Sequence, residues 1–235
     1  WQSLLAGFDS VVHCAGLASV SGEGAEAQAD AINVTATAAL ADGAAKAGVQ
    51  RFVFISSALA GAEPRDTPYA RSKRDAEQRI ESIAAQGGMA TAAQGGMSTA
   101  AKGGMAYVIL RPPMVYGPGC GGNFARLLKM IRRGVPLPLA NATAPKSFIA
   151  IDNLASAVVA AVAHDCARNR TFAVADAEKI STAELVRTMA ASVGKSARLV
   201  PVPQAMLETL GQLTRKEREI RSLFEPLALD ISDIQ

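Results

Sequence analysis

The chain has 235 residues, of which 49% are hydrophobic and 19% charged, and its formal net charge is +3. This balance suits a globular chain with a sizeable core, and the interspersed Lys, Arg, Asp and Glu exclude an extended basic surface for nucleic acid. No apolar run reaches the roughly 20 residues of a membrane span and the three scattered cysteines lack metal-ligand spacing, so we expect a cytoplasmic protein with no membrane partner and no metal.

The first half of the chain alternates strands with helices. The pattern predicts strand Ser10–His13, a helix over about 24–47, strand Arg51–Ser56, a helix from Tyr69 to about Ala85, and strand Tyr107–Arg111. Strands that alternate with helices imply a parallel sheet with right-handed crossovers, so the predicted class is α/β.

An eight-residue repeat follows the second of these helices, with near copies beginning at Ala84, Ala92 and Ala100. Each copy contains a Gly-Gly pair, which we expect to interrupt a helix because each glycine costs about 1 kcal/mol relative to Ala. We interpret the copies as an expanded surface loop, with a lid or partner-binding role as the alternative.

A second lobe is predicted to begin after residue 117, where several glycines precede a helix. Its expected elements are helix Phe124–Arg132, strand Phe148–Ile151, helix Asn153–Ala163, strand 171–175, and a helix from a capping box at Ser181–Glu184 to about Val193.

Tyr69 and Lys73 are the sharpest chemical feature, because residues four apart share one face of a helix. A nearby ammonium favours tyrosinate, so we expect Lys73 to lower the pKa of Tyr69. Ser56 and Ser57 stand at the end of the second strand, where the carboxyl ends of parallel strands form a ligand crevice. A hydroxyl there can hold a substrate oxygen.

These residues, with 11–16, 33–35, 110–119, 147–154 and 229–232, resemble the extended short-chain dehydrogenase/reductases, particularly the epimerase/dehydratase branch with UDP-sugar 4-epimerases. The resemblance implies a Rossmann-like doubly wound parallel sheet whose N-terminal strands are missing, and a smaller C-terminal α/β substrate lobe. The implied domains are a partial dinucleotide-binding domain over 1–116, with a repeat insertion at 84–106, and a mainly substrate-binding lobe over 117–235. Residues 147–175 are expected to return to the sheet.

The same resemblance assigns roles to individual residues. Tyr69 is implied as the acid/base, Lys73 as the group that holds the nicotinamide ribose, and Ser57 as the hydrogen-bond partner of the reacting hydroxyl, with Ser56 in reserve. The implied NAD-binding residues are Ala15, Gly16, Asn33, Ser56, Tyr69, Lys73, Pro113 and Val115. The implied substrate-binding residues are Ser57, Asn123, Phe124, Lys146 and Arg221.

Several of these positions have a structural alternative. Asn33 can equally be a buried capping residue, Arg221 a plain surface arginine, and Tyr116 packing only. The two histidines, His13 and His164, lie beside no nucleophile or other metal-type ligand, and we expect both to be structural.

The implied function is NAD-dependent epimerisation of a nucleotide sugar at C4, of the UDP-hexose or UDP-N-acetylhexosamine type, through a transient keto intermediate. Dehydration is disfavoured because Ala58-Leu59 stands where dehydratases of the family carry Asp-Glu. The alternatives are an NAD(P)-dependent reductase or dehydrogenase of the same family and a non-catalytic dinucleotide-binding protein.

Two further expectations concern assembly and the N-terminus. We expect a homodimer that pairs the Asn33 and Tyr69 helices of two subunits. No Gly-rich strand-to-helix turn precedes Ser10, and backbone N–H groups in such a turn bind the pyrophosphate. We therefore expect this 235-residue chain to bind NAD poorly and to be inactive, although its gene encodes an enzyme.

Overall fold

The computed structural model divides the chain into two compact units, which are described separately. It describes residues 1–18, 24–61, 67–93, 104–214 and 217–234. The first unit comprises Trp1–Pro112, Leu154–Val174 and Ile231–Gln235, and the second comprises Pro113–Asn153 and Ala175–Asp230. Of the Gly-Gly repeats, most of the second copy and the start of the third lie outside the described residues.

A parallel sheet forms the centre of the first unit. Its strands are β1 (Ser10–His13), β2 (Arg51–Ile55), β3 (Ala106–Arg111) and β7 (Arg170–Ala173), in the order β1-β2-β3-β7. Every neighbouring pair is parallel, with Ser10 opposite Arg51 and Arg51 opposite Ala106. The prediction of an α/β fold with a Rossmann-like sheet is thus confirmed.

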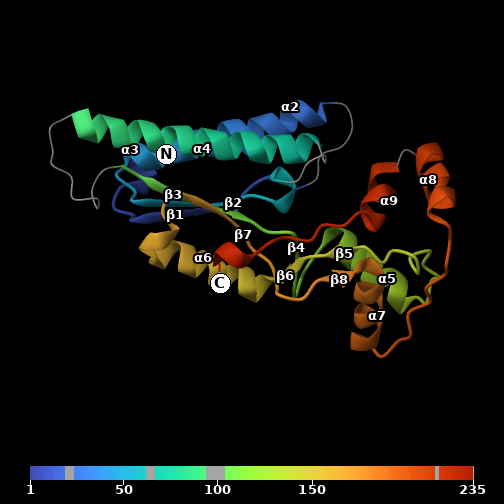
Figure 1. The fold of residues 1–235 in the computed structure, drawn as a ribbon. Helices are drawn as coiled ribbons and strands as arrows, with labels where there is room; N and C mark the ends of the chain where they lie inside the picture. Colours follow the sequence, from blue (N-terminus) through green and yellow to red (C-terminus); the bar gives the residue numbers. More distant parts are fainter. Residues whose placement is uncertain (19–23, 62–66, 94–103, 215–216, 235) are drawn as a thin grey trace. The chain divides into compact units, whose positions relative to one another are not determined.

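Helices cover both faces of this sheet. They are α1 (Gln2–Leu5), α2 (Ala25–Ala29), a π-helical segment (Asp30–Ala36), α3 (Thr37–Lys46), α4 (Pro68–Ala93) and α6 (Ile151–Ala163). Figure 1 shows α3 and α4 on one face of the sheet and α6 on the other. Phe52, Phe54 and Ile109 pack with small alanines of α3 and α4 in one buried cluster. Burial on both faces explains why the central strands β2 and β3 are nearly continuous apolar runs.

Helix α4 is longer than the sequence predicts, because its two glycines do not end it. It was expected to end near Ala85, before Gly87 and Gly88, but it continues through both glycines to Ala93. Extending a helix adds one hydrogen bond per residue without a new nucleus. The helix formers Ala84, Ala85, Gln86 and Met89 surround the pair, so the local glycine cost does not stop the helix.

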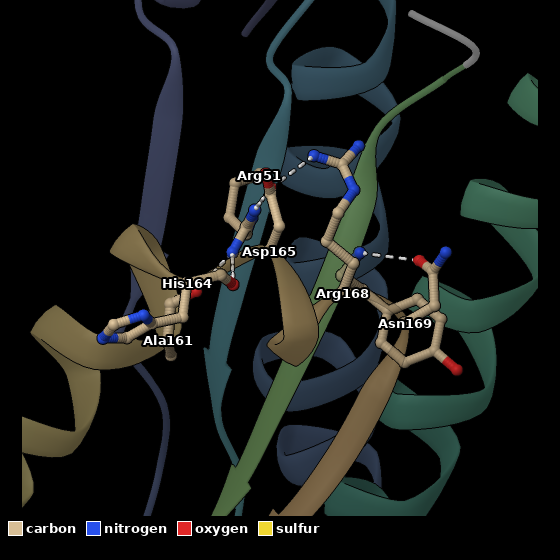
Figure 2. A network of polar contacts seen from close by, with 7 residues as sticks. Arg51, Ala161, His164, Asp165, Arg168 and Asn169 are labelled. Atoms are coloured by element: carbon tan, nitrogen blue, oxygen red, sulfur yellow. Dashed lines mark hydrogen bonds and ion pairs between the residues drawn. The ribbon is translucent and has the colours of Figure 1, made fainter. Parts of the chain in front are cut away.

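A buried arginine ties α6 to the start of β2. Arg51 is 5% exposed. Its Nη1 donates to the carbonyls of Ala161 and His164 at 2.8 and 2.7 Å, and its Nη2 donates to Asp165 at 2.9 Å. Figure 2 shows this guanidinium among the carbonyls that end the helix. It caps carbonyl groups that have no partner within the helix, at the negative end of the helix dipole.

The second unit holds two small sheets and four helices in its described residues. Its elements are β4 (Met114–Tyr116), α5 (Gly122–Arg132), β5 (Pro145–Lys146), β6 (Phe148–Ala150), β8 (Ile180–Ser181), α7 (Thr182–Ser192), α8 (Gln204–Leu213) and α9 (Glu217–Phe224). Strand β4 pairs parallel with β6, and β5 pairs antiparallel with β8. Ile131, Val186 and Met189 share its core. The predicted capping box at Ser181 and Glu184 is confirmed.

Several boundaries differ from the prediction by one or two residues: α5 begins at Gly122 instead of Phe124, and β7 spans Arg170–Ala173 instead of 171–175. The strand expected to run to Ile151 ends at Ala150, and Ile151 begins α6 two residues before the expected start at Asn153. The short strands β4, β5 and β8 were not predicted. At β4, Pro112 and Pro113 indicate the end of extended structure, but strand pairing resumes at Met114. Among the described residues, no helix has both the length and the apolar character needed to cross a lipid bilayer.

Candidate active site

The candidate site lies in the first unit, at the edge where β1 and β2 end. Because these strands are parallel, the residues that follow them meet at one edge of the sheet. Cys14-Ala15-Gly16 follow β1 and Ser56-Ser57 follow β2. The first turns of α4 bring Tyr69 and Lys73 to the same place, as their contacts show.

Tyr69 and Ser57 form the pair expected of an acid/base tyrosine and its serine. A side-chain hydrogen bond joins them and lowers the pKa of Tyr69, while burial raises that pKa by more, so the net direction is upward. Ser57 is buried and its Oγ also accepts from the backbone N–H of Leu59 at 3.2 Å. The prediction that the pKa of Tyr69 is lowered is therefore wrong for this structure, because the loss of hydration at the phenol outweighs the hydrogen bond from Ser57.

Lys73 is 5% exposed and directs its ammonium into the sheet edge. Its Nζ donates to the carbonyl of Ile55 at 3.0 Å and lies 4.6 Å from the centroid of the Phe54 ring. Burial lowers the pKa of Lys73 to about 8, and electrostatic interactions with Glu77 and then Cys14 act in the opposite direction.

Asn33 clamps the loop that follows β1. It is 1% exposed. Its Oδ1 accepts from the N–H of Leu17 at 2.7 Å, and its Nδ2 donates to the Leu17 carbonyl at 3.1 Å and to Ser72 Oγ at 3.0 Å. The π-helical segment carries Asn33, and such segments are frequent at functional sites. These contacts are compatible with both a structural and a functional role for Asn33.

Gly16 leaves space beside Lys73. A Cβ atom at Gly16 would lie 3.0 Å from Asn33 Oδ1 and 3.3 Å from Lys73 Nζ. Without that carbon, the backbone of the loop comes close to a buried ammonium and a buried amide. This arrangement fits a ligand with hydroxyl or phosphate groups, such as a dinucleotide, because an ammonium, an amide oxygen and backbone groups converge there.

Ser56 is engaged elsewhere and does not face Tyr69. Its hydroxyl donates to the Glu77 carboxylate, which Arg111 binds through Nε at 3.0 Å and Nη2 at 2.5 Å. The structure thus favours Ser57 over Ser56 as the partner of the tyrosine. Glu77 and Arg111 were not predicted, although Glu77 follows Lys73 by four residues and so shares its helix face.

His13 is packed in the sheet edge as a structural residue. Its Nε2 lies 2.9 Å from Thr37 Oγ1, and its ring stacks on Phe54 with centroids 5.6 Å apart. Burial, followed by the charge of Lys73, lowers the pKa of His13 to about 4. The imidazole is therefore neutral near pH 7, in accord with the structural role expected for it.

The remaining predicted residues lie in the second unit. Phe124 stacks on Tyr116, and the Tyr116 hydroxyl donates to Asp176 at 2.8 Å, so this tyrosine does more than pack. Lys146 donates to the Ser222 carbonyl in α9, and the same helix holds Arg221 in an ion pair with Glu217 at 3.0 Å. Residues Pro113, Val115 and Asn123 also belong to this unit.

Comparisons with known proteins identify the family and several relatives of this chain. Residues 1–175 match the NAD dependent epimerase/dehydratase family. The chain is 34% identical, over 94% of its length and 68% of the relative, to a UDP-glucose 4-epimerase from Vibrio cholerae. It is 26% identical, over 72% of its length and 47% of the relative, to a ceramide reductase from Caulobacter vibrioides.

The fold also matches a solved structure. The UDP-glucuronic acid 4-epimerase from Bacillus cereus, in complex with NAD, aligns with a TM-score of 0.69 at 22% identity. The alignment covers 86% of this chain and 64% of that structure, so the chain spans a little under two thirds of its length. The chain belongs to the NAD dependent epimerase/dehydratase family.

Proposed function

We propose that this chain carries the reaction site of an NAD-dependent enzyme that inverts C4 of a UDP-linked hexose or N-acetylhexosamine. The observation that carries the proposal is the Tyr69–Ser57 hydrogen bond with Lys73 one helical turn away. The 34% identity to a UDP-glucose 4-epimerase supports the choice of substrate class.

NAD is the cofactor that the fit at Gly16 supports. Ala15, Gly16, Asn33 and Lys73 would hold it in the first unit, and Pro113 and Val115 are the candidates in the second. When bound, NAD supplies a reversible acceptor for the hydride that leaves the sugar carbon. Ser56 is not assigned to the cofactor, because its hydroxyl donates a hydrogen bond to Glu77.

Tyr69 moves the proton in this proposal. Its phenol, kept protonated by burial, can donate to the oxygen of a keto sugar, and the Ser57 hydrogen bond stabilises the phenolate needed for the reverse transfer. Ser57 holds the same substrate oxygen. In the second unit, Asn123 and Phe124 are proposed to contact the nucleotide, while Lys146 and Arg221 are proposed to bind the diphosphate by exchanging their present partners.

Dehydration and simple reduction are the competing reactions. The residues after Ser57 form a short turn, Ala58–Ala60, without a carboxylate to eliminate water. The ceramide reductase relative keeps a reductase as the alternative. Epimerisation consumes no net NADH, whereas reduction consumes one equivalent per product, so an NADH assay separates the two.

The test of the proposed function is a matched pair of tyrosine variants in the full-length protein. Incubation with NAD and either UDP-glucose or UDP-N-acetylglucosamine, followed by proton NMR, should show the C4 epimer. Tyr69→Phe should lower turnover by about two to four orders of magnitude. The control Tyr107→Phe makes the same change at the start of β3 and should keep full activity. Equal activity of both variants would remove Tyr69 from the mechanism.

We also propose a homodimer through the outward faces of the π-helical segment and α4. A hollow of about 560 Å³ between them is lined by Asp30, Val34, Thr35, Asp75, Gln78, Arg79 and Ser82. The acidic and basic residues there can pair with a second copy across a two-fold axis. Light scattering at micromolar concentration should report a dimer, and Asp75→Arg should shift it to monomer. A cytoplasmic location remains a prediction.

A further inference from the structure

Glu77 is a buried carboxylate with an unusually complete set of partners. It is 3% exposed. Its two oxygens accept both arms of the Arg111 fork from the end of β3, and one of them also accepts the Ser56 hydroxyl from the end of β2. A buried carboxylate is stable only when hydrogen bonds and an opposite charge compensate for its lost hydration, and loss of one partner leaves a buried charge unpaired. Three elements, α4, β2 and β3, therefore meet at this one side chain.

These contacts surround Ser57 on both sides. The backbone N–H of Ser56 donates to Leu110 at 2.8 Å and that of Ala58 donates to Pro112 at 2.8 Å, so the β2–β3 ladder is continued past the end of β2. Helix α4 is held to the same stretch by Lys73, which donates to Ile55, and by Arg74, which donates to Ala60 at 3.0 Å. Ser57 is thus fixed opposite Tyr69 by bonds that its neighbours make.

Glu77 also stands one helical turn from Lys73 on the same face of α4. Electrostatic interactions with Glu77 on α4 and Cys14 after β1 act on Lys73, and Lys73 in turn acts on His13 at the end of β1. Of the electrostatic interactions that raise the pKa of Lys73, the one with Glu77 is the largest. Its carboxylate opposes the effect of burial on the pKa of Lys73, the residue proposed to hold the cofactor.

We propose that Glu77, paired with Arg111, is a positioning residue of the Tyr69 site, which fixes Ser57 through Ser56 and keeps a negative charge behind Lys73. This inference rests on the proposed function only in treating Tyr69 and Lys73 as a reaction site. The pair touches neither substrate nor cofactor in this proposal. It acts through Ser56 and through the field at Lys73.

The test is an NMR titration of Lys73 in isotope-labelled protein without cofactor or substrate. The Lys73 side-chain resonance is assigned by its loss in Lys73→Arg. In the parent protein it should titrate near the pKa of about 8 expected from the structure. In Glu77→Gln the midpoint should fall by about one pH unit, the lower end of the effect of a neighbouring opposite charge. Hydrogen exchange at the Ser56 and Ala58 amides should accelerate by about tenfold, because the end of β2 is released.

Two further variants make the result decisive. Glu77→Gln leaves Arg111 without its partner and can unfold the protein. The double variant Glu77→Gln/Arg111→Met therefore removes both charges together, since folded proteins often tolerate the replacement of a whole buried ion pair. Glu81→Gln, one turn further along α4, is the matched control and should leave the titration of Lys73 unchanged. A folded double variant with parental Lys73 titration and parental amide exchange would overturn the proposal. Because no sugar or NAD is present, this outcome is independent of whether the proposed function is correct.

Discussion

Replacing Arg51 with Met should destabilise the first unit by removing the cap at the end of α6. Two bonds run from its charged Nη1 to the buried end of the helix, and each contributes about 1.5 kcal/mol. The bond to Asp165 adds less than about 1 kcal/mol, since that side chain is 87% exposed. Arg51 Nε is buried without a partner among the described residues, so removing this group raises the free energy of unfolding by about 1 kcal/mol.

The net expectation is a loss of about 2 kcal/mol in the free energy of unfolding. For a chain of this size that corresponds to a fall of about 6 °C in Tm. Urea unfolding followed by circular dichroism measures the first quantity, and calorimetry measures the second. Arg168→Met is the control: it removes only a 3.6 Å pair to the same exposed carboxylate and should change stability by less than about 0.5 kcal/mol. Equal stability of the Arg51 and Arg168 variants would refute the capping role.

Three other predictions follow from local contacts. The pKa of His13 is lowered from 6.5 to about 4, so between these pH values the unfolded chain binds more protons than the folded one. Stability therefore falls as the pH falls from 6.5 to about 4. His13→Gln should remove about 2 kcal/mol of this pH dependence, measured by urea unfolding; this is less than the full shift implies, because the ring is only half-buried. Gly16→Ala should displace Lys73 Nζ or Asn33 Oδ1, cost about 1 kcal/mol and shift the Lys73 NMR resonance; an unchanged resonance would contradict the close approach. Ser181→Ala should cost about 1 kcal/mol in thermal unfolding by removing one half of the capping box, and no change would show that α7 does not depend on it.

Features set by local sequence were predictable. Strand Ser10–His13 follows from a short apolar segment that ends before a glycine, and the capping box follows from the three-residue spacing of Ser181 and Glu184. Both are found where expected. The Tyr69–Lys73 spacing depends only on helix geometry. The helix over 24–47 was also predictable, but its π-helical segment was not, because no residue type in it forces that geometry.

Features that depend on contacts between distant residues were not predictable. Ser56 and Ser57 are adjacent in the chain, and only the position of Glu77 on α4 and Arg111 on β3 decides which hydroxyl is left for Tyr69. The upward direction of the Tyr69 pKa likewise depends on burial, which a spacing of four residues does not reveal. The passage of α4 through Gly87 shows a local cost outweighed by continuation of a long helix.

The central claim is that Tyr69, Ser57 and Lys73 carry a transient oxidation at C4 of a nucleotide sugar. The most direct measurement incubates the full-length protein with NAD and UDP-glucose in deuterated water and follows the C4 proton by NMR. The account predicts the C4 epimer with its original C4 proton retained, since the hydride returns to the carbon it left, and it predicts loss of this product in Tyr69→Phe. Product that carries solvent deuterium at C4, or net consumption of added NADH without an epimer, would contradict it.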